Sequence, residues 1–234
     1  TIITPSNDLP TFVDELTATP TNFDSRTVWP GKIGAIRDQQ QCGACWAFGA
    51  SEAFADRYAI NSGEVLVFSP EEMVSCDTSN FGCQGGYLNK ANDYIVRHGV
   101  SLDSCTPYTA GSGSAPSCSS TCSNGSAMKL YKAKAVQSAG SPSSIKNLIA
   151  AGGPVETGFT VYEDFFAYKS GIYHHVSGGQ AGGHAVKIIG WGVEAGTNFW
   201  IVANSWGTSW GINGTFKIRQ GECGIDQRVY GVTF

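Results

Sequence analysis

The sequence is poor in charged residues, in methionine and in long apolar runs. Only 15% of its 234 residues are Asp, Glu, Lys or Arg, and the net charge is -4. This balance argues against a nucleic-acid-binding protein, which would carry a basic face. No apolar stretch approaches the roughly 20 residues that a transmembrane helix needs, so no membrane span is expected.

Cysteine, by contrast, is abundant. Eight cysteines stand against two methionines, which favours an oxidising compartment. A hydrophobic fraction of 41% with low charge indicates a globular protein, long enough for one large domain or two lobes. Two sequons, which begin at Asn124 and Asn213, are glycosylation candidates and fit a secretory route. No signal peptide is present, so we interpret the chain as a processed form.

The strongest chemical signal is the segment QQQCGACWAF at residues 39–48. After it, apolar residues recur at three- and four-residue steps as far as Tyr58, and Gly63 stops the pattern. This predicts a helix with Cys45 in its first turn. Unpaired backbone N–H groups and the positive end of the helix dipole would favour a thiolate there, and the thiolate is the reactive form of cysteine.

Two interpretations of the CGAC segment compete. One is a redox or metal pair formed by Cys42 and Cys45, because C-x-x-C serves both purposes. The other is a nucleophile at Cys45, with Cys42 in a structural disulfide. Trp46 follows the second cysteine, whereas thioredoxin-like motifs carry a tryptophan before the first. No second C-x-x-C and no H-x-x-x-H completes a zinc site. We therefore favour the nucleophile, and expect neither a metal nor an organic cofactor.

A cysteine nucleophile needs a histidine that takes up and returns a proton, and a third group that orients this histidine. His98 lies at a predicted helix end, and His174 and His175 lie in a predicted surface turn. His184, in GGHAV at the start of a strand-like run, is the best candidate. Asn204, in NSWG after the next such run, could accept the ring N–H if the two strands are neighbours.

The order of the predicted elements favours an α+β protein. Helices are predicted at residues 44–58, from Ser69 onward, at residues 88–98 and at residues 144–151. At the second of these, Ser69 is expected to be the N-cap and Glu72 to close a capping box. Strands are predicted at residues 185–191, 198–204, 215–219 and 229–234, and a disulfide-pinned loop at residues 108–126. Helices first and strands later indicate two lobes, with a substrate cleft between them.

The CGACW, GGHAV and NSWG segments make the chain resemble the papain-like cysteine peptidases, whose signature is C-G-[SA]-C-[WY]. The resemblance runs from Phe23 to the end and is closest to the cathepsin B branch. It implies a papain-like fold with a mainly helical lobe, residues 21–128, and an antiparallel, barrel-like β lobe, residues 129–234. Residues 1–20 would be an N-terminal arm that remains from the prosegment of a zymogen.

The resemblance also implies the catalytic roles. Cys45 would be the nucleophile, His184 the general base and then acid, and Asn204 the residue that orients His184. Gln39, six residues before Cys45, would donate its amide to the oxyanion together with the backbone N–H of Cys45. Trp206 would shield the bond between His184 and Asn204 from water.

Substrate-binding residues follow from the same resemblance, and they are Gly85, Gly86, Tyr87, Leu88, Gly158, Gly183, Ala185, Trp206 and Arg228. The glycines at 85 and 86 would pair with extended substrate. Most of the others would line the second subsite, which is the pocket for the side chain two residues before the scissile bond. At its floor the cathepsin B branch has an acidic residue, and this sequence has Arg228. Arg228 would either accept acidic side chains or snorkel to solvent and leave an apolar pocket.

The implied disulfides are Cys42–Cys83, Cys76–Cys118 and Cys105–Cys122, which would leave Cys223 free and buried. Between the positions of Cys105 and Cys118 the branch carries an occluding loop, whose paired histidines bind the C-terminal carboxylate of a substrate. Here residues 106–117 contain no histidine and no charge. The expected activity is therefore that of an endopeptidase without strong dipeptidyl carboxypeptidase activity.

The expected partners are protein or peptide substrates, cystatin-like inhibitors and the chain's own prosegment, with the protein a monomer. The expected location is the lysosome, a lysosome-like or secretory vesicle, or the extracellular space. Two other classes remain open. One is a thiol oxidoreductase that uses Cys42 and Cys45, and the other is a catalytically silent relative.

Overall fold

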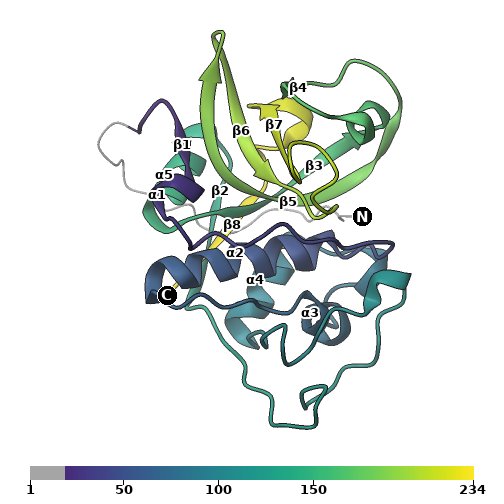
Figure 1. Ribbon diagram of the computed structural model, residues 1–234. Helices are drawn as coiled ribbons and strands as arrows, with labels where there is room; N and C mark the ends of the chain where they lie inside the picture. The colour runs from purple at the N-terminus through teal and green to yellow at the C-terminus, as the bar shows by residue number, and fades with distance from the viewer. Residues whose placement is uncertain (1–18) are drawn as a thin grey trace.

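The computed structural model describes residues 19–234, so the predicted prosegment remnant lies almost wholly outside the described residues. The chain forms a helical lobe and a sheet lobe, and helix α2 (Cys45–Ser62) lies where the two meet (Figure 1). Helices α3 (Pro70–Cys76) and α4 (Leu88–Arg97) pack on α2 in the helical lobe. The short β1 (Phe23–Asp24) and α1 (Ser25–Val28) precede them. The α+β class is confirmed.

The sheet has the strand order β2-β8-β3-β5-β6-β7-β4, and β1 pairs with β5. Its strands are β2 (Ala135–Ala139), β3 (Val155–Tyr162), β4 (Ile172–Tyr173), β5 (Gln180–Glu194), β6 (Thr197–Ala203), β7 (Thr215–Arg219) and β8 (Val229–Thr233). All pairs are antiparallel except that of β4 with β7. Among the described residues the ladder stays open between its end strands β2 and β4.

Most predicted elements are present, with shifted boundaries. Helix α2 begins after Ala44 and ends at Gly63, whose φ of 82° suits a left-handed cap. The helix predicted from residue 144 is α5 (Pro142–Gly152), which begins earlier because Ser141 caps it and exchanges hydrogen bonds with Ser144. The strand predicted from residue 185 begins at Gln180, because the glycines before His184 already pair with β3. Strands β1, β2, β3 and β4 were not predicted.

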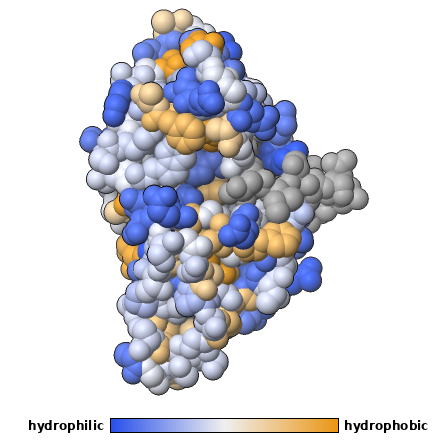
Figure 2. Space-filling model, turned by 90° about the vertical axis from the view of Figure 1, so that its right-hand side faces the viewer, coloured by the Kyte–Doolittle hydropathy of each residue, from blue (hydrophilic) through white to orange (hydrophobic). Residues whose placement is uncertain are grey.

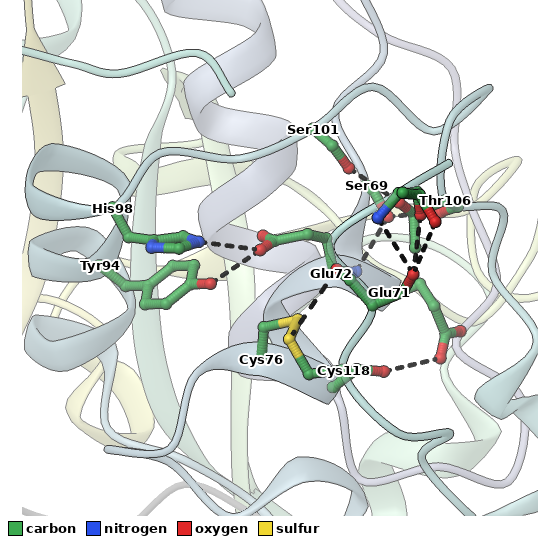
Figure 3. The surroundings of a disulfide bond; sticks show 12 residues. Ser69, Glu71, Glu72, Cys76, Tyr94, His98, Ser101, Thr106 and Cys118 are labelled. Atoms are coloured by element: carbon green, nitrogen blue, oxygen red, sulfur yellow. Dashed lines mark hydrogen bonds and ion pairs between the residues drawn. A yellow bond between two sulfur atoms is a disulfide. The ribbon is translucent and has the colours of Figure 1, made fainter. Parts of the chain in front are cut away.

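The capping box predicted at α3 is wrong, although Ser69 does cap the helix. The Ser69 hydroxyl accepts from the backbone N–H of Glu72 at 3.0 Å. The backbone N–H of Ser69, however, donates to the carbonyl of Ser101 at 2.9 Å. The Glu72 carboxylate turns away, toward the hydroxyl of Tyr94 at 2.7 Å and Nε2 of His98 at 3.5 Å (Figure 3).

The three disulfides join the pairs that the resemblance implied: Cys42–Cys83, Cys76–Cys118 and Cys105–Cys122. The second ties the end of α3 to the predicted loop (Figure 3). Cys223 is free but half-buried, because it lies in a short 3-10 turn, Glu222–Gly224, beside a pocket. With Cys42 held in a disulfide, a redox pair of Cys42 and Cys45 is excluded.

Each lobe has its own hydrophobic core. A segment near each end of the described chain packs on the lobe to which the rest of its half of the chain does not belong. The sheet core contains Trp191 and Trp200, and Phe23 stacks on Trp191 with ring centroids 4.4 Å apart. The helical core contains Trp46 and Phe48, and Val232 from β8 is buried in it. The boundary between the two lobes at residues 128 and 129 therefore stays a prediction, because β1 lies on the sheet lobe and part of β8 packs in the helical core.

The junction of the two lobes is unusually polar. The ammonium of Lys187 on β5 lies 2.6 Å from Oδ2 of Asp56 and 3.6 Å from Oε2 of Glu52, both on α2, and all three side chains are buried. Next to them, Arg57 donates to the carbonyls of Val232 at 2.6 Å and Gly153 at 2.7 Å. Charged groups therefore hold α2 against the sheet.

No helix within residues 19–234 is both long and apolar enough to cross a membrane.

Candidate active site

Cys45 is the first residue of α2 and is 1% exposed. No side chain caps this helix, so the backbone N–H groups of its first turn and the positive end of its dipole face the thiol. Figure 2 views the molecule from the side on which α2 begins (right-hand end in Figure 1). On this face apolar side chains gather in separate patches on both lobes, with hydrophilic side chains between them.

His184 and Asn204 come together as the strand pairing predicts. His184 lies on β5, and Asn204 directly follows β6, the antiparallel neighbour of β5. Nε2 of His184 lies 2.7 Å from Oδ1 of Asn204, and both side chains are buried. The indole ring of Trp206 covers the imidazole, with centroids 4.7 Å apart. This arrangement leaves Nδ1 of His184 available to the thiol of Cys45.

The protonation of Cys45 is set by its surroundings. Burial raises the pKa of the thiol, but the hydrogen bond and the charge of His184 oppose this, and the net pKa falls to about 6. Cysteine ordinarily titrates near 8.5, so the surroundings of Cys45 favour its thiolate form at neutral pH. The thiolate is the nucleophilic form of cysteine.

Gln39 connects the two lobes next to Cys45. Its amide Nε2 donates to the carbonyl of Cys42 at 2.9 Å. Its Oε1 accepts from the hydroxyl of Ser205 at 2.7 Å, and its backbone N–H donates to the carbonyl of Ser205 at 2.9 Å. The amide carries two hydrogens, and Cys42 takes one. Sequence reasoning missed Ser205, and the only signal for it was its place between Asn204 and Trp206.

Glu156 is a second residue that sequence reasoning missed as part of the site. It is fully buried on β3, and Nδ2 of Asn92 donates to its Oε2 at 2.6 Å. Gly49 on α2 makes room for it, since a Cβ there would lie 2.8 Å from Oε1. Burial raises the pKa of this carboxyl well above its usual range, and the nearby charge of Cys45 raises it further. This shift favours the neutral form of Glu156 over a second negative charge near Cys45.

A pocket of about 270 Å³ contains part of the set of residues predicted for the second subsite. Three predicted residues line it, namely Gly158, Gly183 and Arg228, and most of its lining is polar. Leu88 and Ala185 pack against Cys45 instead. Arg228 is half-buried, and within residues 19–234 its guanidinium has no ion-pair partner.

The predicted backbone-pairing stretch has little room for side chains. A Cβ at Gly86 would lie 2.7 Å from the ring of Trp46, and Gly85 has a φ of 118°, which favours glycine. The backbone N–H of Tyr87 donates to Oδ1 of Asn80 at 2.7 Å, which fixes the segment.

The other histidines lie apart from Cys45. His98 follows α4 and faces Glu72. His175 lies 3.2 Å from Asp164 through Nδ1 and stacks on Tyr162, while His174 is exposed. Residues 19–234 contain no group of three or more potential metal ligands.

The segment at the position of the occluding loop contacts the residues that precede Cys45. The hydroxyl of Tyr108 donates to the carbonyl of Gln39 at 2.8 Å, and the backbone N–H of Gln41 donates to the carbonyl of Gly111 at 2.9 Å. After the 3-10 turn Ala110–Ser112, the chain runs around the end of the helical lobe that faces away from the sheet (Figure 1).

Comparisons with known proteins agree with this geometry. The family described as "Papain family cysteine protease" matches residues 19–233. A "Gut-specific cysteine proteinase" of Caenorhabditis elegans is 43% identical, over 92% of this chain and 73% of the relative. "Cathepsin B" of Dictyostelium discoideum is 39% identical, over 90% of this chain and 73% of the relative.

Among solved structures, "proCathepsin B S9 from Trypanosoma congolense" is similar. It has a TM-score of 0.91 and 35% identity, with 96% of this chain and 82% of that chain covered. The chain therefore belongs to the papain family of cysteine proteases, in its cathepsin B-like branch.

Proposed function

We propose that this cysteine protease is an endopeptidase in which Cys45, His184, Asn204 and Gln39 form the catalytic group. The Cys45 thiolate attacks the peptide carbonyl and forms a tetrahedral intermediate. Its oxyanion accepts hydrogen bonds from the free amide hydrogen of Gln39 and from the backbone N–H of Cys45. His184 then gives its proton to the leaving amine and activates the water that releases the acyl group.

One arrangement carries this proposal: Asn204 holds the buried ring of His184 at 2.7 Å, and that ring interacts with the thiol of Cys45 at the start of α2 and lowers its pKa. The bond from Asn204 fixes which ring nitrogen faces the thiol. Trp206 limits the access of water to that bond, which strengthens it. A catalytically silent relative would have no need for a thiolate.

The endopeptidase part of the proposal rests on residues 106–117. Without a histidine or a charged residue, this segment has no cationic side chain to pair with a C-terminal carboxylate. After its contacts with Gln39 and Gln41, it runs around the end of the helical lobe that faces away from the sheet (Figure 1). Substrates that continue beyond the scissile bond would then be accepted.

Two peptides that differ only at the C-terminus test this part. One ends in a free carboxylate two residues after the cleaved bond, and the other carries an amide there. We expect kcat/KM values within about threefold of each other, because only a charged group of the missing loop would separate them. A preference of tenfold or more for the free carboxylate, with release of a dipeptide, would show that a carboxylate site exists.

Gln39→Ala should lower kcat/KM by about two to three orders of magnitude, because one oxyanion donor is lost. The alkylation rate of Cys45 by iodoacetamide should stay unchanged, since alkylation forms no oxyanion. Gln41→Ala is the matched control, because Gln41 is exposed and lies two residues away. If alkylation slows in parallel with peptide cleavage, Gln39 acts on the thiolate rather than on the oxyanion.

The second subsite should prefer acidic side chains. Arg228 lines a mainly polar pocket and lacks an ion-pair partner in the described chain, so an incoming carboxylate would give it one. Arg228→Glu should reverse the preference between Glu and Arg at that substrate position by tenfold or more. Arg97→Glu, at an exposed position on α4, controls for the change in net charge. An unchanged preference in Arg228→Glu would mean that Arg228 points to solvent.

The proposals for partners, oligomeric state, location and glycosylation rest on the membership of the chain in this family. Protein or peptide substrates, cystatin-like inhibitors and a prosegment are the proposed partners, and the chain is proposed to act as a monomer. Three disulfides and the sequons at Asn124 and Asn213 fit a lysosomal, vesicular or secreted protein. The two sequon asparagines are proposed glycosylation sites.

A further inference from the structure

The backbone carbonyl of Gln39 is held from the helical lobe by a tyrosine outside the catalytic group. The hydroxyl of Tyr108 donates to this carbonyl at 2.8 Å. A second donor, the backbone N–H of Cys42, lies farther away at 3.4 Å. The ring of Tyr108 packs edge-on against Phe48 of α2, with centroids 4.8 Å apart. Tyr108 therefore ties the residue that carries the oxyanion amide to the helix that carries Cys45.

Two further contacts join the segment of residues 108–111 to the residues that follow Gln39. The backbone N–H of Gln41 donates to the carbonyl of Gly111 at 2.9 Å. Gly111 also lies against the side chain of Gln40, since a Cβ built at this glycine would overlap Oε1 of Gln40. All three residues from Gln39 to Gln41 are thus held by one segment.

A buried side chain fixes this segment in turn. Oε2 of Glu71, on α3, accepts from the backbone N–H groups of Thr109 at 2.6 Å and Ala110 at 2.9 Å. Glu71 is 1% exposed. Because both N–H groups converge on one oxygen of a buried side chain, the backbone next to Tyr108 is fixed to α3.

The bonds of Gln39 fall into two sets. Its Oε1 accepts from the hydroxyl of Ser205 at 2.7 Å and its Nε2 donates to the carbonyl of Cys42 at 2.9 Å, and these bonds set the rotation of the amide. The position of the backbone below the amide depends instead on the bonds of the Gln39 N–H to Ser205 and of its carbonyl to Tyr108. A catalytic group must be held within about 0.5 Å of its productive position, so both sets matter for an oxyanion donor.

We propose that Tyr108 is a positioning residue for peptide cleavage, because it holds the backbone of Gln39 where the amide can meet the oxyanion. This role presupposes the proposed function of Gln39 as an oxyanion donor. The segment at the position of the occluding loop would then support the oxyanion site rather than bind a carboxylate. Tyr108 acts through Gln39 alone, so its loss should slow catalysis and leave the thiolate of Cys45 unaffected.

Tyr108→Phe removes only the hydroxyl and keeps the ring that packs on Phe48. We expect kcat for peptide cleavage to fall by about three- to tenfold, the loss expected for one hydrogen bond. KM should stay unchanged, because the oxyanion is absent from the bound substrate. The alkylation rate of Cys45 by iodoacetamide should also stay unchanged, which shows that the variant is folded. Tyr94→Phe is the matched control, because the Tyr94 hydroxyl donates to Glu72 instead, at 2.7 Å, and should leave kcat unchanged.

The second measurement combines Tyr108→Phe with Gln39→Ala. The added Tyr108→Phe change should then lower kcat by less than about twofold, because the amide that Tyr108 positions is already gone. An unchanged kcat in Tyr108→Phe, or an effect that persists in full in the double variant, would overturn the positioning role. So would alkylation that slows in parallel with kcat, since the hydroxyl would then act on Cys45. A normal kcat in Gln39→Ala alone would instead refute the oxyanion role of Gln39, so the two failures are distinguishable.

Discussion

His184→Ala should lower kcat/KM by about four orders of magnitude or more, because the thiolate loses both its counter-charge and its proton shuttle. The pKa of Cys45 should change as well. With His184 present it is about 6, and without His184 only burial and the start of α2 act on it. Since burial raises the pKa of a thiol, the midpoint of iodoacetamide alkylation against pH should move from about 6 to 8.5 or above.

The control is His175→Ala, which removes a histidine that pairs with Asp164 instead. It should leave both peptide cleavage and the alkylation midpoint unchanged. If the midpoint stays near 6 in His184→Ala, the helix start alone lowers the pKa of Cys45. The proposed thiolate–imidazolium pair would then be wrong.

Lys187→Met should destabilise the protein by about 3–5 kcal/mol, which is the usual cost of removing one partner of a buried ion pair. Lys187 is the only cation within 4.0 Å of the buried carboxylates of Glu52 and Asp56 among residues 19–234. Without it, both carboxyls must take up protons or stay charged and unpaired in a junction that is closed to water. The measurement is urea unfolding at pH 7, in a Cys45→Ala background that prevents self-digestion.

Lys217→Met provides the matched comparison. Lys217 pairs with Glu194 at 2.8 Å, but the two side chains are 33% and 57% accessible to water. An exposed pair of this kind contributes about 0–1 kcal/mol. Similar unfolding free energies for the two variants would mean that the junction is held by apolar packing rather than by its charges.

The catalytic residues could be found from the sequence because each lies in a short, characteristic segment. Cys45 follows CGA, His184 follows a pair of glycines, and Asn204 precedes Ser205-Trp206. Their meeting also followed from the sequence, since β5 and β6 are consecutive strands joined by a two-residue turn. Local motifs and neighbouring strands therefore suffice for most of the site.

Contacts between distant segments could not be predicted. Glu52, Asp56 and Arg57 resemble a solvated face of α2 in the sequence, yet all three are buried. Their partners are Lys187, 131 residues from Asp56, and carbonyls as far away as that of Val232. The bond between Ser205 and Gln39 spans 166 residues in the same way.

Strand β3 was missed for a related reason. Its first five residues are all buried, so it lacks the alternation of polar and apolar residues that identifies a strand. It also carries Glu156, whose burial depends on the amide of Asn92 and on the absence of a side chain at Gly49. None of these partners is near it in the sequence.

The most direct test of the central claim is to incubate the protein with a diverse mixture of peptides under mild reduction and to identify the products by mass spectrometry. The Cys45→Ala variant is treated in parallel. Our account predicts cuts at internal peptide bonds, enriched for acidic side chains two residues before the cleaved bond, and none in the variant. Internal cuts that persist in Cys45→Ala, or products that are mainly C-terminal dipeptides, would contradict it.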